Sequence, residues 1–311
     1  MIITVTLNTA IDKAYHMEHG IAGGTVMRVK QVCNTAGGKG LNVARAIKLC
    51  GERVLATGIA GGFNGRYLES LLNADGIPHD FLQVESETRS CINILDSRFG
   101  STEFLEPGFE VSRAEEAAFL KHFRSLIEKS DMVTISGSAP RGMSSDIYAQ
   151  MIAMVKAANK PALLDTSGKL LMEGLQAKPT VIKPNQEELE ALLGVKINGM
   201  NDVAACAERL FRQGIPHVIV SLGKEGAILA CEPGIYHVVP PRINAVNTVG
   251  CGDSMVGGFA VALLRGDAPS EALKYAVAVA SAGAMNEGTG SFDPQKRDKL
   301  LEQITVNKIN I

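Results

Sequence analysis

The feature of this sequence that most constrains its fold is a regular alternation of strand-like and helix-like segments. Apolar, β-branched runs such as 2–7 and 132–136 alternate along the chain with longer stretches of helical spacing, such as 41–50 and 147–158. Strands that alternate with helices of about ten or more residues are typical of a mainly parallel sheet covered by helices on both faces. The sequence therefore predicts an α/β fold.

The same patterns predict the remaining elements. We expect strands at 54–59, 162–165, 180–182 and 217–222, and helices at 67–74, 187–193, 203–213, 255–265 and 270–287. Ligands of open α/β sheets bind at the carboxyl ends of the strands. Functional residues are therefore expected on the turns that lead from strands to helices.

Two segments interrupt the alternation. Residues 13–34 contain Gly20, Gly23 and Gly24 and resemble short extended pieces, and residues 87–105 are typical of two strands around a turn at Phe99-Gly100. Hairpins inserted in a parallel α/β fold often form a lid or an oligomer contact, and surface decoration is the alternative. We divide the chain into an α/β core (1–12, 35–86 and 106–311) and a β lid (13–34 and 87–105).

Charge and cysteine usage exclude several classes of protein. The chain has 31 Lys and Arg and 33 Asp and Glu, so no general electrostatic attraction to nucleic acid or to an anionic membrane is expected. The six cysteines form no CxxC pair and predict neither a zinc site nor a disulfide framework. Because the N-terminus does not resemble a signal peptide and no run of 18 apolar residues occurs, we expect a cytoplasmic protein.

The strongest local motif is the octamer 248–255, which precedes an apolar helix. Gly250 and Gly252 allow a tight turn that points successive N–H groups outward, and the partial positive charge of the helix start makes this a candidate anion site. The Asp253 carboxylate can take a proton from a hydroxyl while those N–H groups stabilise a transferring phosphoryl group. A plain helix start is the alternative. A dinucleotide site is disfavoured, because Met255 occupies the place of the third glycine.

Three further motifs carry polar residues on turns. Residues 36–44 superficially resemble a P-loop, but Gly40 follows Lys39 where a P-loop has Ser or Thr. Residues 183–188 are typical of a helix N-cap and also suit Mg²⁺ and its waters. Residues 221–226 form a glycine turn that is either a simple hairpin or a place where a nucleotide approaches the backbone.

Together these motifs and their order resemble the ribokinase-like carbohydrate kinase family, in its phosphofructokinase-B branch. The resemblance rests on GGKGxNVA at 37–44, KPNxxE at 183–188, SLGxxG at 221–226 and TVGxGD at 248–253, and it spans nearly the whole chain. It implies a three-layer fold with a central mainly parallel sheet and a small β-sheet lid. It also implies ATP-dependent transfer of a phosphoryl group to a sugar hydroxyl.

The resemblance also implies a role for individual residues. Asp253 would be the base, and the N–H groups of Gly250, Cys251 and Gly252 would form the anion hole. The sugar would be held by Asp12, Gly37, Gly38, Lys39, Asn42, Ser136 and Gly137. ATP and Mg²⁺ would be held by Lys183, Asn185, Glu188, Ser221, Gly223, Gly226, Thr248 and Asn286, with Glu188 acting on the metal through water. A homodimer through the β lid is implied, and a monovalent-cation requirement is left open.

Positive charge indicates the class of acceptor. Lys39, Arg89 and Arg28 predict that the sugar already carries a phosphate, since arginine binds phosphate bidentately. Residues 87–95 and 102–108 resemble tagatose-6-phosphate kinases most, and 1-phosphofructokinases next. A ketohexose furanose has a CH₂O group at each end, so tagatose 6-phosphate and fructose 1-phosphate fit nearly the same site. A neutral-sugar or nucleoside kinase and a non-catalytic sugar-phosphate sensor are the remaining alternatives.

Overall fold

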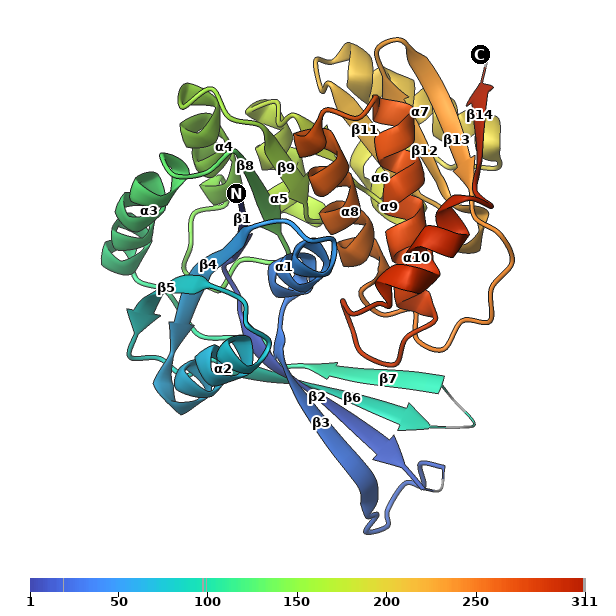
Figure 1. Ribbon diagram of the computed structural model, residues 1–311. Helices are drawn as coiled ribbons and strands as arrows, with labels where there is room; N and C mark the ends of the chain where they lie inside the picture. Colours follow the sequence, from blue (N-terminus) through green and yellow to red (C-terminus); the bar gives the residue numbers. More distant parts are fainter. Residues whose placement is uncertain (19, 97, 99, 310–311) are drawn as a thin grey trace.

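The computed structural model describes residues 1–18, 20–96, 98 and 100–309, and it contains a ten-stranded and a four-stranded sheet (Figure 1). The strand order of the large sheet is β14-β13-β12-β11-β10-β9-β8-β1-β4-β5. From β11 to β5 neighbouring strands run parallel, and β12 to β14 add an antiparallel edge. The bounds are β1 (Ile2–Thr6), β4 (Val54–Gly61), β5 (His79–Val84), β8 (Met132–Ser136), β9 (Ala162–Asp165), β10 (Val181–Ile182), β11 (His217–Ser221), β12 (Ala227–Cys231), β13 (Gly234–Val239) and β14 (Thr305–Ile309).

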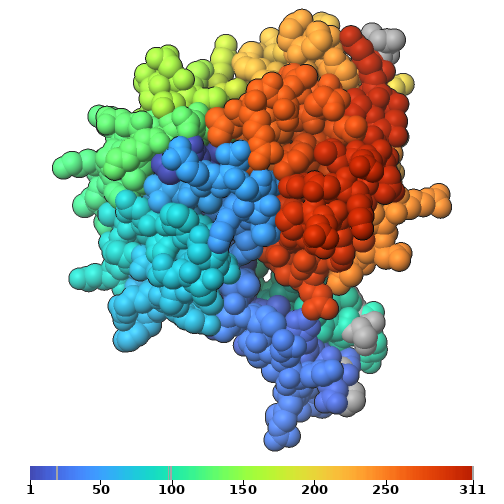
Figure 2. Space-filling view, viewed as in Figure 1, coloured from blue at the N-terminus to red at the C-terminus, as the bar shows by residue number. Residues whose placement is uncertain are grey.

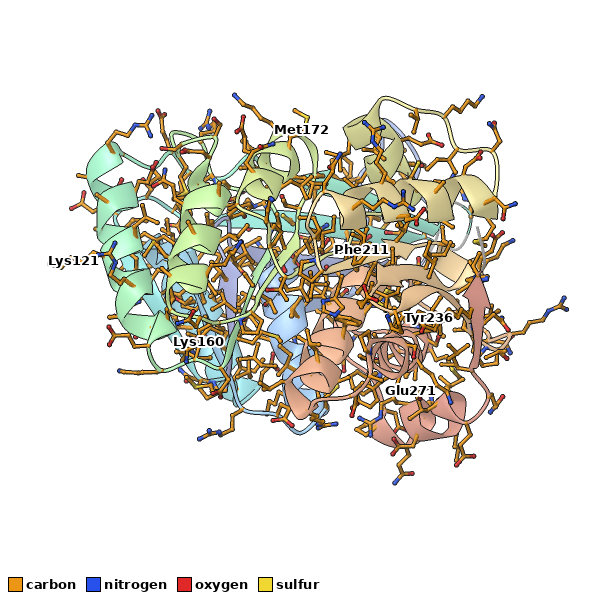
Figure 3. All side chains as sticks on the ribbon, turned by 90° about the horizontal axis from the view of Figure 1, so that it is seen from above. Lys121, Lys160, Met172, Phe211, Tyr236 and Glu271 are labelled. Carbon is orange, nitrogen blue, oxygen red and sulfur yellow. The ribbon has the colours of Figure 1, made fainter. Side chains whose placement is uncertain are left out.

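Helices cover both faces of the large sheet, as the alternation of segments predicts. The bounds are α1 (Lys39–Leu49), α2 (Gly62–Ala74), α3 (Arg113–Ile127), α4 (Ile147–Ala157), α5 (Gly168–Gln176), α6 (Gln186–Leu193), α7 (Met200–Arg212), α8 (Cys251–Arg265), α9 (Pro269–Ala284) and α10 (Pro294–Leu301). Ile2 packs with α1, α2 and α8 to α10, whereas the next residue, Ile3, packs with α3 to α7. Figure 3 shows the helices with Lys121 and Met172 on one side of the sheet and that with Glu271 on the other. None of the helices in the described residues has the length and apolar character needed to span a bilayer.

The helix boundaries differ from the sequence prediction at informative places. Helix α8 begins at Cys251 rather than 255, which puts Asp253 in its first turn. Helix α9 ends at Ala284 rather than 287, because the Asn286 side chain bonds the Gly288 N–H and turns the chain. Helix α2 begins at Gly62 rather than 67, and α3, α5 and α10 were not predicted.

The two interrupting segments form one four-stranded sheet of order β3-β2-β6-β7, called here the small sheet. Its strands are β2 (Ala10–Met17), β3 (Val29–Gly37), β6 (Arg89–Asp96) and β7 (Gly100–Leu105). Three residues separate the end of β1 from the start of β2, and Asp12 belongs to the small sheet. Residue 99 of the expected turn lies outside the described residues. The small sheet projects from the body of the molecule (Figure 2).

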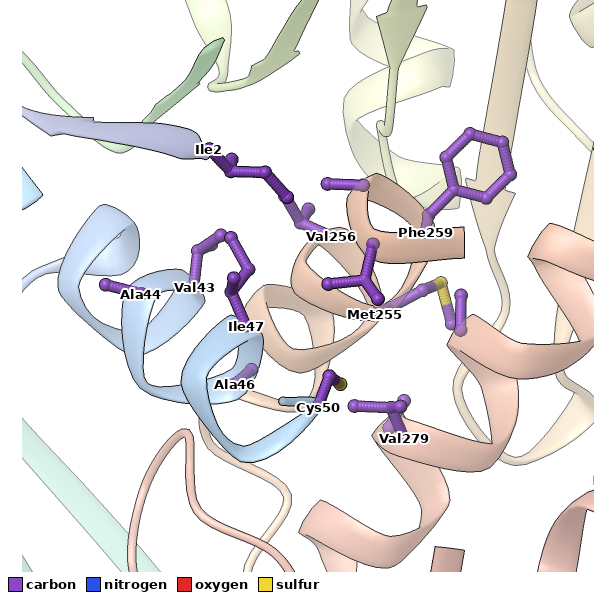
Figure 4. Close-up of a cluster of buried hydrophobic side chains, with 14 of the residues drawn as sticks. Ile2, Val43, Ala44, Ala46, Ile47, Cys50, Met255, Val256, Phe259 and Val279 are labelled. Atoms are coloured by element: carbon purple, nitrogen blue, oxygen red, sulfur yellow. The ribbon is translucent and has the colours of Figure 1, made fainter. Parts of the chain in front are cut away.

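The contact between α1 and α8 positions the ends of these helices. A Cβ atom at Gly257 would lie 2.9 Å from the Ala46 Cβ, so glycine lets the two helices approach closely. Side chains of both helices, including Ile47 and Val256, meet in the surrounding buried cluster (Figure 4). The N-termini of α1 and α8 therefore lie together at the carboxyl end of the parallel strands.

Candidate active site

A cavity of about 900 Å³ lies at the carboxyl ends of the parallel strands, where the small sheet meets the body. It is lined by strand-to-helix turns of the large sheet and by alternate residues of the small sheet, such as Asp12, Cys33 and Asn93. Side chains of a strand alternate between its two faces, so one face of the small sheet forms a wall of the cavity.

The N-terminus of α8 points into this cavity. Gly250 is the N-cap and has a φ of 78°, a left-handed conformation that glycine adopts without strain. Because Gly250 has no side chain to cap the helix, the N–H groups of the first turn have no side-chain acceptor there. Gly252 also brings Lys183 close, since a Cβ there would lie 3.3 Å from the Lys183 Nζ. The Cys251 N–H donates to the Thr248 backbone oxygen at 3.3 Å. The N–H groups of Gly252 and Asp253, with the Lys183 ammonium, are therefore the donors that can form a cradle for an anion.

Asp253 lies at the edge of that cradle. It is 6% exposed, and its Oδ2 accepts a hydrogen bond of 2.8 Å from the Asn42 Nδ2. Burial is the main reason that the pKa of Asp253 is raised to about 6, with the nearby Asp165 carboxylate adding to the rise. Lys39, Asn42 and Lys183 act in the opposite direction and lower the pKa. Asp253 is therefore ionised at neutral pH and can accept a proton.

Asp165 is a site residue that sequence reasoning missed. It ends β9, is 1% exposed, and its Oδ1 lies 3.2 Å from the Lys183 Nζ and 3.8 Å from the Lys39 Nζ. The Asp165 carboxylate is the main reason that the pKa of Lys39 is raised, so this ammonium stays charged. The sequence did carry a signal, because the predicted strand 162–165 ends in a carboxylate at the edge where ligands bind.

Asp12 and Arg89 lie together at the junction of β1, β2 and β6. Burial raises the pKa of Asp12 to about 6, and the Arg89 charge opposes that rise. Arg89 donates to the backbone oxygens of Asn8 and Glu106, at 3.3 and 2.7 Å, which fixes its guanidinium beside the cavity. The Arg89 Nε is buried without a hydrogen-bond partner. A carboxylate that accepts from hydroxyls and a guanidinium that binds phosphate are thus adjacent.

The segment after β10 forms the helix N-cap that its sequence predicts, and the magnesium role stays a prediction. The Asn185 Oδ1 accepts from the Glu188 N–H at 2.8 Å, and the Glu188 Oε2 accepts from the Asn185 N–H at 2.9 Å. This capping box starts α6 and leaves the Glu188 Oε1 outside it. Both residues also line the cavity.

Few carboxylates are available for a metal here. The described residues contain no cluster of three or more His, Cys, Asp or Glu that could hold one. Mg²⁺ does not need such a cluster, since it keeps several waters and takes substrate phosphates as ligands. A carboxylate at the cavity edge, such as that of Glu188, has the chemistry to accept hydrogen bonds from those waters.

The structure brings most of the predicted residues together. Among the cavity-lining residues are Asp12, Gly38, Lys39, Asn42, Arg89, Gly137, Lys183, Asn185, Glu188, Ser221, Gly250, Gly252, Asp253 and Asn286. Asn247 and Thr289 also line it, although neither was predicted. Asn247 donates to the Glu287 backbone oxygen at 2.9 Å and so joins the two loops beside the α8 N-terminus.

Other predicted residues lie outside the lining of the cavity. Ser136 is buried at the end of β8, Arg28 and Thr248 are exposed, and Gly37, Cys251 and Gly223 contribute no lining surface. Gly226 has a structural reason to be glycine: its φ is 88°, and a Cβ would lie 1.9 Å from the Val238 backbone oxygen of β13. The hairpin alternative thus accounts for Gly226 without a nucleotide.

Comparisons with known proteins agree with the motifs. The model of the pfkB family of carbohydrate kinases matches residues 4–296. The tagatose-6-phosphate kinase of Staphylococcus epidermidis is 39% identical over 312 residues, which cover 99% of this chain and 100% of that protein.

Solved structures give the same result. Phosphofructokinase-2 from Escherichia coli, in complex with potassium, superposes with a TM-score of 0.90 at 29% identity, over 97% of this chain and 98% of that one. A possible 1-phosphofructokinase from Thermotoga maritima gives a TM-score of 0.91 at 26% identity, over 100% of both chains. The predicted family and fold class are confirmed.

The raised pKa of Asp253 predicts how stability depends on pH. The folded state favours the protonated Asp253 carboxyl, because its pKa is raised. Its contribution to the free energy of unfolding is therefore full below about pH 4 and is lost as pH rises to about 6. At about pH 8, Asp253→Asn should therefore raise the free energy of unfolding by up to about 3 kcal/mol, and the gain should vanish below about pH 4. Thermal unfolding of both proteins across this range measures it.

Asp267→Asn is the matched control, since Asp267 is exposed just beyond the other end of α8. It should leave the melting temperature unchanged. If Asp253→Asn is less stable than the parent at about pH 8, the pKa of this carboxyl is not raised by burial.

Proposed function

Because the chain belongs to the pfkB family of carbohydrate kinases, we propose that it transfers the γ-phosphoryl group of ATP to a ketohexose monophosphate, with tagatose 6-phosphate as the preferred acceptor. The chain is a phosphotransferase that acts on a sugar hydroxyl. The observation that supports this site for the reaction is the Asp253 carboxylate, held at the N-terminus of α8 with two lysines beside it.

In the proposed transfer each group has a part. The free hydroxymethyl group of the acceptor lies against Asp253, which takes its proton as the oxygen bonds to the γ-phosphorus. The bond from that phosphorus to the bridging oxygen breaks, and ADP leaves. Charge on the transferring group is stabilised by the N–H groups of 252–253 and by the ammonium groups of Lys39 and Lys183. Mg²⁺ on the nucleotide phosphates supplies further charge neutralisation, and Asn185 and Glu188 would hold its waters.

A phosphorylated ketohexose suits the charges at the opposite side of the site. Asp12 accepts from ring hydroxyls, and Arg89, which lines the cavity, offers its guanidinium to the acceptor phosphate. Anchoring the phosphate at one CH₂O group places the other at Asp253. The relative of 39% identity supports tagatose 6-phosphate.

Fructose 1-phosphate is the second candidate acceptor. It is supported by the Thermotoga maritima neighbour, described as a possible 1-phosphofructokinase. The two acceptors place phosphate and free hydroxymethyl group at opposite ends of a ketohexose, so the same cavity admits either. Their discrimination depends on ring hydroxyls, above all that on C4.

We further propose that the small sheet forms a homodimer contact. Its face away from the cavity carries Tyr15, Val32, Ile94 and Phe104, as the strand register places them. Val32 is 45% and Phe104 57% exposed. An exposed apolar patch of this kind is typical of an interface, and the small sheet stands clear of the body (Figure 2).

Steady-state kinetics test the proposed reaction. With ATP and Mg²⁺, kcat/KM should be highest for tagatose 6-phosphate among tagatose 6-phosphate, fructose 1-phosphate, fructose 6-phosphate and unphosphorylated tagatose. Asp253→Asn should lower kcat by about 10²–10⁴-fold with ATP binding retained, because only the proton acceptor is lost. Asp267→Asn is again the control. A higher kcat/KM for fructose 1-phosphate would reverse the substrate assignment. Unchanged turnover in Asp253→Asn would show that Asp253 is not the base.

Arg89→Ala tests the proposed phosphate anchor. It should raise KM for the sugar phosphate by about 10- to 100-fold and leave KM for ATP unchanged, since a charge-assisted hydrogen bond to the acceptor is lost. Arg141→Ala is a matched control, because Arg141 is exposed and outside the cavity lining. An unchanged KM for the sugar phosphate in Arg89→Ala would show that the phosphate binds elsewhere.

Phe104→Asp tests the proposed dimer. Sedimentation analysis should find a dimer for the parent chain and mainly monomer for Phe104→Asp, because the charge would be buried in an apolar contact. Phe63→Asp supplies the control, since Phe63 is 79% exposed on α2. A dimer that persists in Phe104→Asp, or a monomeric parent, contradicts the proposed interface.

A further inference from the structure

Arg45 is a buried cation close to the site that does not line the cavity. It lies in α1 three residues after Asn42 and is 8% exposed. Arginine is almost never buried to this extent unless all sides of its guanidinium are paired. Its partners therefore indicate why it is there.

The guanidinium of Arg45 joins four segments. Its Nη1 donates to the Asn42 Oδ1 and to the Thr289 backbone oxygen, both at 3.2 Å. Its Nη2 donates to the Ala36 backbone oxygen at 3.1 Å, and its Nε donates to the Asp75 Oδ2 at 3.1 Å. Thr289 lines the cavity, Ala36 is the penultimate residue of β3, and Asp75 follows α2.

The bond from Arg45 determines which end of the Asn42 amide faces Asp253. The two ends of an amide have the same shape, but one accepts and the other donates. With Oδ1 held by Arg45, Nδ2 points to the Asp253 Oδ2. The reversed amide would place its oxygen against the Asp253 carboxylate and its NH₂ against a guanidinium, and both contacts are repulsive.

We infer that Arg45 is a positioning residue for phosphoryl transfer: by holding the Asn42 amide in one orientation, it keeps a hydrogen-bond donor on the Asp253 carboxylate. The inference rests on the proposed function, in which Asp253 accepts the proton. Arg45 does not line the cavity and reaches Asp253 through Asn42; its charge also lowers the pKa of Asp12, an effect that Arg45→Lys retains. The same guanidinium ties the loop at Thr289 to the end of β3.

The charges around Asp253 give the direction of the effect. Lys39 from α1 and Lys183 from the β10–α6 turn face it, Asp165 faces it from β9, and Asp12 and the Cys251 thiol lie nearby. The lysines and the Asn42 N–H favour the ionised carboxylate, whereas Asp165 and burial disfavour it. Release of the amide removes one favourable contact, so the pKa of Asp253 should rise.

The test is the pH dependence of the single-turnover rate in Arg45→Gln and Arg45→Lys. The pH below which the rate falls should increase by about one unit in Arg45→Gln, the effect of losing a hydrogen bond to a charged group. Arg45→Lys keeps the buried positive charge and is therefore expected to fold. Because one ammonium cannot bind all four partners, the pH below which the rate falls should increase by less than in Arg45→Gln. Because each comparison uses the same substrates, substrate ionisation cancels. An unchanged pH profile in either folded variant overturns the inference.

A double-mutant cycle separates positioning from general loosening. In an Asn42→Ala background no amide remains to be oriented, so Arg45→Lys should then cause no further displacement of the pH profile. An additive displacement would mean that Arg45 does not act through Asn42. If Asp253→Asn retains full turnover, Asp253 is not the base of the proposed reaction. That result differs from both outcomes of the double-mutant cycle.

Arg265→Gln is the matched control. Arg265 ends α8 and donates to the Cys50 backbone oxygen at 2.8 Å and to Glu52 at 2.9 Å, so it also ties α8 to the end of α1, but far from Asp253. This variant should lower the melting temperature and leave the pH profile unchanged. A displaced profile in Arg265→Gln would show that any loosening of the two helices has this effect, and would overturn the specific role of Arg45.

Discussion

The close packing of α1 on α8 is the contact on which the site depends. Gly257 lies one turn after Asp253 in α8, and Ala46 lies one turn after Asn42 in α1. The close contact between Gly257 and Ala46 therefore brings Asn42 within hydrogen-bond distance of Asp253. A larger residue at Gly257 would have to displace the Ala46 side chain or the Val43 backbone. Asn42 and Asp253 are 211 residues apart in the chain, and their hydrogen bond exists only because this interface is so tight.

The second constraint is electrostatic. The Asp165 carboxylate lies close enough to Asp253 to raise its pKa, while the ammonium groups of Lys39 and Lys183 pair with Asp165 and lower the pKa of Asp253. Buried ion pairs often contribute no more to stability than well-packed apolar residues of similar volume, because the charges must be removed from water. Here their arrangement instead keeps a proton acceptor ionised near neutral pH beside a positive cradle. The ionised Asp253 carboxylate thus lowers the stability of the folded protein, and the same carboxylate is the proton acceptor of the proposed reaction.

The sequence predicted those parts of the site that local motifs specify. Gly250 was singled out because glycine before a helix leaves N–H groups available to an anion, and Asp253 because its carboxylate can take a proton beside them and because four ordered motifs resemble a kinase family. The order of strands and helices predicted the α/β fold. Asp165 and Arg45 were not found, since their roles come from partners brought by tertiary packing: Thr289 is 244 residues from Arg45. Gly226 shows the opposite case, a motif residue whose glycine is explained by the backbone of a neighbouring strand.

The path of the chain from β1 into β2 has a consequence for how an acceptor is gripped. Only three residues separate the central strand β1 from β2, and Asp12 belongs to β2 itself. In the proposed reaction Asp12 holds the sugar, and this carboxylate lies on the same sheet as the residues that form one wall of the cavity. A displacement of the small sheet toward the body would therefore carry the sugar contact and the cavity wall together, which would couple acceptor binding to enclosure of the phosphoryl group.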